Sequence, residues 1–144
     1  MNPDENLLQI RDFQGEGFQP LVTSTAWRVA MLRYMDRIHP ARIDNLERHL
    51  LTDEVFVLVQ GRGVLILGNN GSQADGLIPQ EMEIGVVYNI RANTWHTVLL
   101  SPDAAVLIVE NSDTGEENTE ICNVNDKMRK EIVSIARQFS FALD

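Results

Sequence analysis

Short apolar segments, each separated from the next by turn-forming residues, recur through most of this 144-residue chain. Residues 55–59, 64–67, 96–100 and 104–110 are largely apolar, and glycine, proline or asparagine lies between them. Short segments at this spacing are typical of strands in a β-sandwich or β-barrel. The sequence therefore predicts an all-β fold.

The apolar run at residues 55–59 does not alternate with polar residues, which indicates a strand covered on both faces. One face would fill the interior of a barrel, and the other would pack on a second layer or a second subunit. Further strands are expected at 18–22, 25–34 and 84–90, while residues 76–82 give no clear pattern. The polar and acidic segment 111–125 is expected to be a solvated loop.

One helix is expected near the end of the chain, at residues 127–139. Its apolar side chains recur at helical spacing and form a stripe that would pack on the outside of the barrel or on a partner: Met128, Ile132, Ile135 and Phe139. Asn125 or Asp126 can cap its first turn. We expect an N-terminal arm (1–17), a β-barrel (18–112) and an acidic loop with the C-terminal helix (113–144).

The charge and composition of the chain argue against several classes of binding partner and against a membrane-spanning segment. A net charge of −9 argues against nucleic acid or an anionic membrane. No apolar run approaches the roughly 20 residues that a membrane-spanning helix needs, and the N-terminus does not resemble a signal peptide. A cytoplasmic protein with a small-molecule ligand is expected. The two-sided apolar strands and the helix stripe also predict a homodimer.

Residue types that bind metals gather at the start of two predicted strands. Glu47 and His49 are two positions apart, so on a strand both side chains point to the same face. Glu54 follows an expected bend at Thr52 and Asp53 and can return to that face. His96 begins another strand. Two imidazoles with one carboxylate form the facial triad used by non-haem iron, which leaves other positions open.

The spacing of these residues resembles the two motifs of the cupin superfamily. His49, four residues, Glu54, six residues and Gly61 match the first motif, with Glu47 in place of its first histidine. Residues 85–96 match the frame of the second motif, from its glycine to its histidine. Three other positions depart from that second motif: Arg91, Asn93 and Leu100. Asn93 replaces a glycine, and asparagine adopts the left-handed conformation more readily than most residues.

The resemblance implies a double-stranded β-helix, or jelly-roll barrel, and a divalent metal bound by Glu47, His49, Glu54 and His96. The mixed donor set favours Fe or Mn, while Zn and Ni remain possible. Glu47 and Glu54 are candidate catalytic groups, because either could move a proton beside the metal. Arg91 and Tyr88 are candidate substrate-binding residues: Tyr88 could line the pocket, and Arg91 could bind an anionic group.

Three functions follow from this resemblance. The first is a metal-dependent enzyme acting on a small polar molecule such as a sugar or carboxylic acid, of the isomerase, epimerase or oxygenase type. The second is a non-catalytic module that binds a metal or small molecule, since Glu47, Arg91 and Leu100 depart from the motifs. The third is a metal-free sugar epimerase with His49 as base and Tyr88 as acid.

Overall fold

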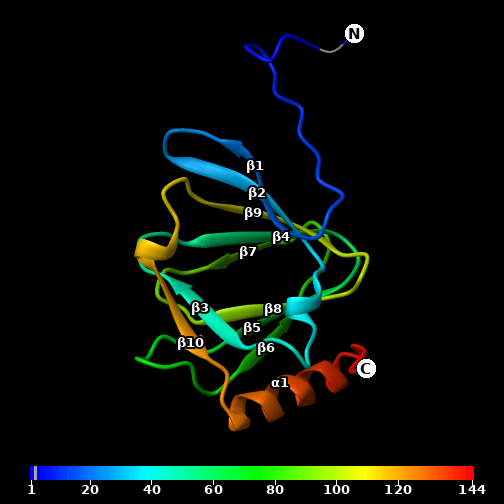
Figure 1. Cartoon of the computed structure of the whole chain (residues 1–144), viewed down its shortest axis with the longest axis vertical. Coiled ribbons are helices and arrows are strands. Elements are labelled where there is room, and N and C mark those ends of the chain that lie inside the picture. Colours follow the sequence, from blue (N-terminus) through cyan, green and yellow to red (C-terminus); the bar gives the residue numbers. More distant parts are fainter. Residues whose placement is uncertain (2) are drawn as a thin grey trace.

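A computed structural model describes Met1 and residues 3–144, and it contains two five-stranded antiparallel sheets that face each other (Figure 1). Sheet A has the order β1-β2-β9-β4-β7, and sheet B has the order β10-β3-β8-β5-β6. The strands of sheet A are β1 (Gly17–Thr23), β2 (Trp27–Arg33), β4 (Glu54–Gln60), β7 (Val87–Ile90) and β9 (Ala105–Asn111). Those of sheet B are β3 (Asn45–His49), β5 (Gly63–Leu67), β6 (Ile78–Glu81), β8 (His96–Leu100) and β10 (Thr119–Asn123).

The path of the chain makes this a double-stranded β-helix. From β2 onward nearly every connection crosses from one sheet to the other, and only β5 and β6 are consecutive partners within a sheet. The predicted all-β fold, a cupin-like jelly-roll barrel with a C-terminal α-helix, is confirmed.

The barrel interior is filled by alternate side chains of facing strands. On β4 the inward residues Phe56 and Leu58 are buried, and on β9 the inward residues Val106 and Ile108 are buried. They pack against side chains from sheet B, including Leu65, Val98 and Leu100. Burial of this kind stabilises a fold by roughly 1.5–3 kcal/mol for each large apolar side chain.

The helix α1 (Asp126–Gln138) covers the outer face of sheet B, as Figure 1 shows. Asn125 caps it, because its side chain accepts a hydrogen bond from the backbone N–H of Met128 at 2.8 Å. The buried stripe packs on outward residues of sheet B, including Val64, Ile66 and Leu99. Trp95 and Met128 form a second cluster under the start of the helix. The prediction that this helix packs on the outside of the barrel is confirmed.

The outer face of sheet A has no such cover within the described part of the chain. Cross-strand registers align its apolar side chains in two rows, Val29–Val109–Val55 and Met31–Leu107–Val57–Val87. Most of these side chains are partly exposed, and Val87 is 64% exposed. We expected the outer face of residues 55–59 to pack on a second layer or a second subunit. The described residues of this chain do not supply such a layer.

Two segments differ from the predictions. The expected loop at 111–125 contains β10, which pairs with β3 and completes one edge of sheet B, so the sheets extend past residue 112. Residues 78–81 form β6, and the strand expected from residue 84 begins only at Val87. Both new strands lie at sheet edges and are polar or mixed in sequence, so apolar periodicity did not reveal them.

Two short 3-10 helices, η1 (Asp36–Ile38) and η2 (Glu116–Asn118), complete the elements. Among the residues that the model describes, no helix has the length and apolar character needed to cross a membrane.

Candidate metal centre

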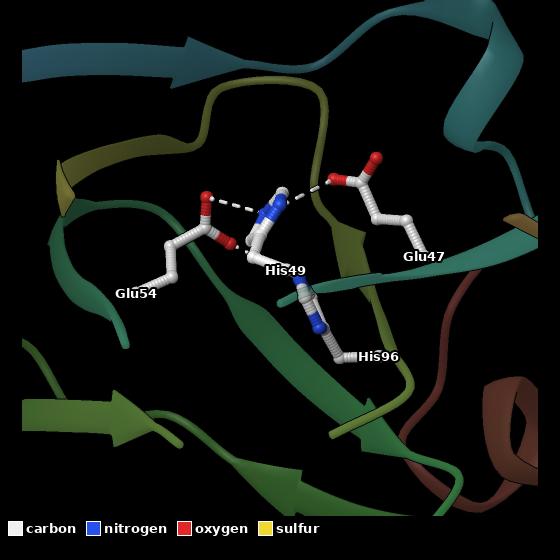
Figure 2. Close-up of side chains that lie close together, drawn as sticks. All are labelled: Glu47, His49, Glu54 and His96. Carbon is white, nitrogen blue, oxygen red and sulfur yellow. Dashed lines mark hydrogen bonds and ion pairs between the residues drawn. The ribbon is translucent and has the colours of Figure 1, made fainter. Parts of the chain in front are cut away.

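The four predicted ligands lie together inside one end of the barrel (Figure 2). Glu47 and His49 come from β3, Glu54 opens β4, and His96 opens β8. One nitrogen or oxygen atom from each of these residues lies within 4.8 Å of the others. The two sheets thus bring to one point side chains that are up to 49 positions apart in the sequence, from Glu47 to His96.

Three hydrogen bonds join β7 and the turn before His96 to the end of β3 and the residues that follow it. The backbone N–H of Asn93 donates to the carbonyl of His49 at 2.8 Å. The carboxylate of Asp53 accepts hydrogen bonds from the backbone of Ala92 at 2.8 Å and from the side chain of Asn89 at 3.0 Å. Asn93 has a φ of 66°, so the left-handed conformation expected at this position is confirmed. These contacts place the start of β8 beside β3, where Glu47 pairs with His96.

Glu54 lies between the two imidazoles. Its Oε1 is 3.0 Å from Nε2 of His96, in a buried hydrogen bond. Its Oε2 is 3.2 Å from Nε2 of His49, an ion-pair contact without hydrogen-bond geometry. The two rings are 5.5 Å apart between centroids. Glu47 lies on the other side of His49, with Oε1 at 3.8 Å from Nε2, and its side chain is 44% exposed.

Both imidazoles are oriented through the nitrogen that faces away from the cluster. Nδ1 of His96 donates to the carbonyl of Thr94 at 2.9 Å, and a carbonyl can only accept. Nδ1 of His49 lies 2.9 Å from Oγ1 of Thr119 on β10. Nε2 of His96 also donates to the ionised Glu54, so this ring carries two protons. Loss of the Nε2 proton would leave a neutral imidazole with its lone pair on Nε2, which is the usual arrangement of a metal-binding histidine.

Burial and charge act in opposite directions on the protonation of this cluster. Burial lowers the pKa of His49 and of His96, but the adjacent Glu54 carboxylate outweighs it, so the pKa of each imidazole is raised. Burial would raise the pKa of Glu54, yet its contacts with both imidazoles hold that pKa well below the usual range. Glu54 is therefore ionised, and the cluster attracts positive charge.

Sequence analysis missed a third acidic residue of the cluster, Glu110 of β9. Its side chain is buried, and Oε2 lies 3.8 Å from Nε2 of His49. Burial and the neighbouring Glu54 raise the pKa of Glu110 to about 8, although Arg28 opposes this. Arg28 of β2 pairs with Oε1 of Glu110 at 2.7 Å. The sequence pattern could have revealed it, because Glu110 and Arg28 are charged residues at inward positions whose neighbours on the same face are apolar.

The cluster borders a cavity of about 680 Å³. Much of its remaining lining is apolar, with Phe18, Leu32, Met35, Ile38, Ile43 and Ile108 among the residues. A cavity of this size with a few converging polar groups is typical of a small-molecule site. Glu47 is the most exposed member of the cluster and so the one most accessible from the cavity.

The two predicted substrate-binding residues, Tyr88 and Arg91, are not brought to this cavity. They line a second, smaller cavity of about 230 Å³. The hydroxyl of Tyr88 accepts a hydrogen bond from the backbone of Glu83 at 2.8 Å, and the side chain of Arg91 is 80% exposed and pairs with Asp53 at 3.3 Å. The structure therefore does not place Tyr88 opposite His49, as a shared acid and base would require.

Comparison with known proteins gives structural matches but no sequence match. No protein-family model and no curated protein sequence matches the chain. The capsular polysaccharide assembling protein CapF from Staphylococcus aureus matches with a TM-score of 0.55 at 17% identity, over 80% of this chain and 32% of CapF. Streptomyces PAC13 in a structure with uridine matches with a TM-score of 0.53 at 15% identity, over 83% of this chain and 87% of PAC13.

This chain therefore spans about a third of CapF and most of PAC13. A further structure describes Pac13 as a nucleoside dehydratase. At these identities the likeness concerns the fold.

Proposed function

We propose that this protein of the cupin fold is a metal-dependent enzyme acting on a small polar molecule of the sugar or carboxylic acid class. The observation that carries the proposal is the convergence of Glu47, His49, Glu54 and His96 beside a cavity of about 680 Å³. The ion would be Fe, Mn, Zn or Ni, held by these four side chains.

The residues present fit a divalent cation. Nε2 of His49 and Oε2 of Glu110 are buried and find no hydrogen-bond partner among the described residues. When a bound ion replaces the proton that Glu110 otherwise keeps, Glu47, Glu54 and Glu110 carry three negative charges, and Arg28 offsets one. A divalent ion balances the remaining two charges, which would otherwise be costly to bury.

The reaction that these groups support best is proton transfer on a hydroxyl- or carbonyl-bearing substrate, of the isomerase or epimerase type. A divalent ion in such a site stabilises negative charge that develops on a substrate oxygen. Glu54 is held between two imidazoles and serves as a ligand, whereas Glu47 is partly exposed and can take up or return a proton. PAC13, with its uridine ligand, shows that a chain of this fold and size accommodates a sugar-bearing molecule.

Metal analysis tests the proposal. The protein should be purified without chelators and compared with His96→Ala, which removes one ligand, and His39→Ala, which removes the histidine outside the cluster. We expect bound metal in the parent protein and in His39→Ala, and a large loss in His96→Ala. Equal metal in all three proteins would end the proposal.

A panel of sugars and carboxylic acids then separates the enzyme from a non-catalytic binding module. Thermal shifts report binding, and product analysis reports turnover. Stabilisation without turnover on every compound that binds supports the module. Full turnover by metal-free protein would instead support a metal-free epimerase.

We also propose that two copies associate through the outer face of sheet A. Its two apolar rows, Val29–Val109–Val55 and Met31–Leu107–Val57–Val87, form a continuous surface across four strands. The opposite sheet buries its outer face under α1, whereas no described element does so here. A second copy would remove this surface from water.

A further inference from the structure

The fold directs a third carboxylate, Glu110, at the candidate metal centre. On β9, Val106, Ile108 and Glu110 alternate inward and are all buried. β9 pairs with β4 so that Val109 is opposite Val55, and the next pair along this register is Glu110 opposite Glu54. On its other side β9 pairs with β2, where Glu110 is opposite Arg28. Glu110 therefore stands between a ligand and an arginine.

Arg28 holds one oxygen of this carboxylate and leaves the other free. Its Nε and Nη2 both donate to Oε1 of Glu110, at 3.1 and 2.7 Å. The Phe18 ring lies 5.5 Å from the guanidinium carbon of Arg28 and helps to fix its position. Oε2 of Glu110 is left facing Nε2 of His49 at 3.8 Å, the same separation as between that nitrogen and Oε1 of Glu47.

The two facing atoms need a positive partner. Glu110 is only 5% exposed and His49 only 7%, and neither Oε2 nor Nε2 has a hydrogen-bond partner among the described residues. Once Glu110 has given up its proton, its carboxylate oxygen and the Nε2 of a neutral, Nδ1-protonated imidazole both present lone pairs, so neither can donate to the other. A cation between them satisfies both atoms at once.

We propose that Glu110, positioned by Arg28, is a fifth protein donor of the metal centre, and that its charge shifts the preference of the centre toward hard divalent ions such as Mn(II) and away from Zn(II). This rests on the proposed function, since it concerns the same ion. Carboxylate oxygens are preferred ligands of Mn(II), whereas imidazole nitrogens are preferred ligands of Zn(II). A third carboxylate therefore contributes more to the binding of Mn(II) than of Zn(II).

The test uses Glu110→Gln, which keeps an oxygen for Arg28 and removes the charge. Dissociation constants for Mn(II) and Zn(II) are measured by calorimetry or chelator competition on the metal-free protein. We expect the Mn(II) constant to rise by about tenfold or more, the scale seen when a group supporting a metal site is lost. The Zn(II) constant should rise several-fold less. Glu116→Gln is the matched control, because Glu116 lines the same cavity but is exposed.

Each outcome separates the two proposals. Unchanged Mn(II) binding in a folded Glu110→Gln protein, as expected if a water molecule fills the gap, would overturn the role of Glu110 and leave the metal-dependent function standing. Equal losses for both ions would overturn the selectivity. Absence of binding in the parent protein would overturn both proposals. Should Glu110→Gln fail to fold, Glu110→Asp keeps the charge on a shorter side chain, and its Mn(II) constant should still rise more than its Zn(II) constant.

Discussion

Asn93 donates its backbone N–H to the carbonyl of His49 at 2.8 Å, and this bond joins the turn before one ligand strand to the end of another. The turn holds its shape only while residue 93 keeps its positive φ of 66°. The position of His96, three residues later, depends on that shape. The left-handed backbone conformation of Asn93 therefore helps to shape the candidate metal centre.

The first prediction concerns this turn. Asn93→Val should lower the free energy of unfolding by about 1–2 kcal/mol, because a β-branched residue is strained in the left-handed region. Asn93→Gly should change it by less than about 1 kcal/mol, since glycine adopts this conformation freely. Urea unfolding of the metal-free proteins measures both. Equal stability of the valine and glycine variants would show that the turn does not need this conformation.

Thr119 provides a second prediction, because it orients His49 from β10. Thr119→Val removes the hydroxyl that lies 2.9 Å from Nδ1 of His49, and we expect metal affinity to fall about tenfold. Thr119→Ser keeps the hydroxyl and should bind metal as the parent does. Titration of the metal-free proteins with one metal salt gives the comparison. If the valine variant binds as tightly as the serine variant, the hydroxyl has no orienting role.

The third prediction is that the metal-free protein loses stability as pH rises. The pKa of Glu110 is raised from its usual 4.5 to about 8, so between these values the folded chain keeps a proton that the unfolded chain has lost. The raised pKa values of His49 and His96 act in the same direction above their usual 6.5. A state that binds more protons is destabilised when pH rises, so the thermal midpoint should be lower at about pH 9 than at about pH 6.

At the acid end of the pH range, Glu54 has the opposite effect on stability from Glu110. Its lowered pKa stabilises the fold above the usual 4.5, and this contribution is lost as pH falls toward its folded value.

Glu110→Gln should flatten the loss of stability between pH 4.5 and 8. Bound metal should reverse this loss, because the metal replaces the protons. A thermal midpoint that rises steadily from pH 6 to 9 without metal would contradict this account.

The fourth prediction concerns the second copy. Light scattering should give about twice the chain mass of 16.3 kDa. Val57→Glu places a charge in the middle of an apolar row of sheet A and should shift the protein toward the monomer. Ile78→Glu, at a 51% exposed apolar residue of sheet B, is the control and should leave the mass unchanged. A parent mass near that of one chain would contradict the association, and so would a folded Val57→Glu protein that stays dimeric.

Local sequence patterns showed which residues form strands better than they showed which strands pair. The runs at 55–59 and 64–67 could be predicted as strands because they are short and apolar. β10 is mostly polar and could not be predicted in this way, because it is held by its pairing with the edge of β3. Thr119 could not be found as a partner of His49 for the same reason. Tyr88 and Arg91 are close to the motifs in sequence, yet they line a different cavity, since nearness along the chain does not decide which opening of a barrel a side chain faces.

The amino-acid sequence by itself determined the all-β fold and the C-terminal helix, which depend on composition and on spacings of a few residues along the chain. The resemblance to two sequence motifs selected Glu47, His49, Glu54 and His96, the four residues that the fold brings together. Only the tertiary structure decided that Arg28 and Glu110 join the same centre. Their meeting depends on the register between β2, β9 and β4, and a register between strands distant in sequence is set by the packing of the whole barrel.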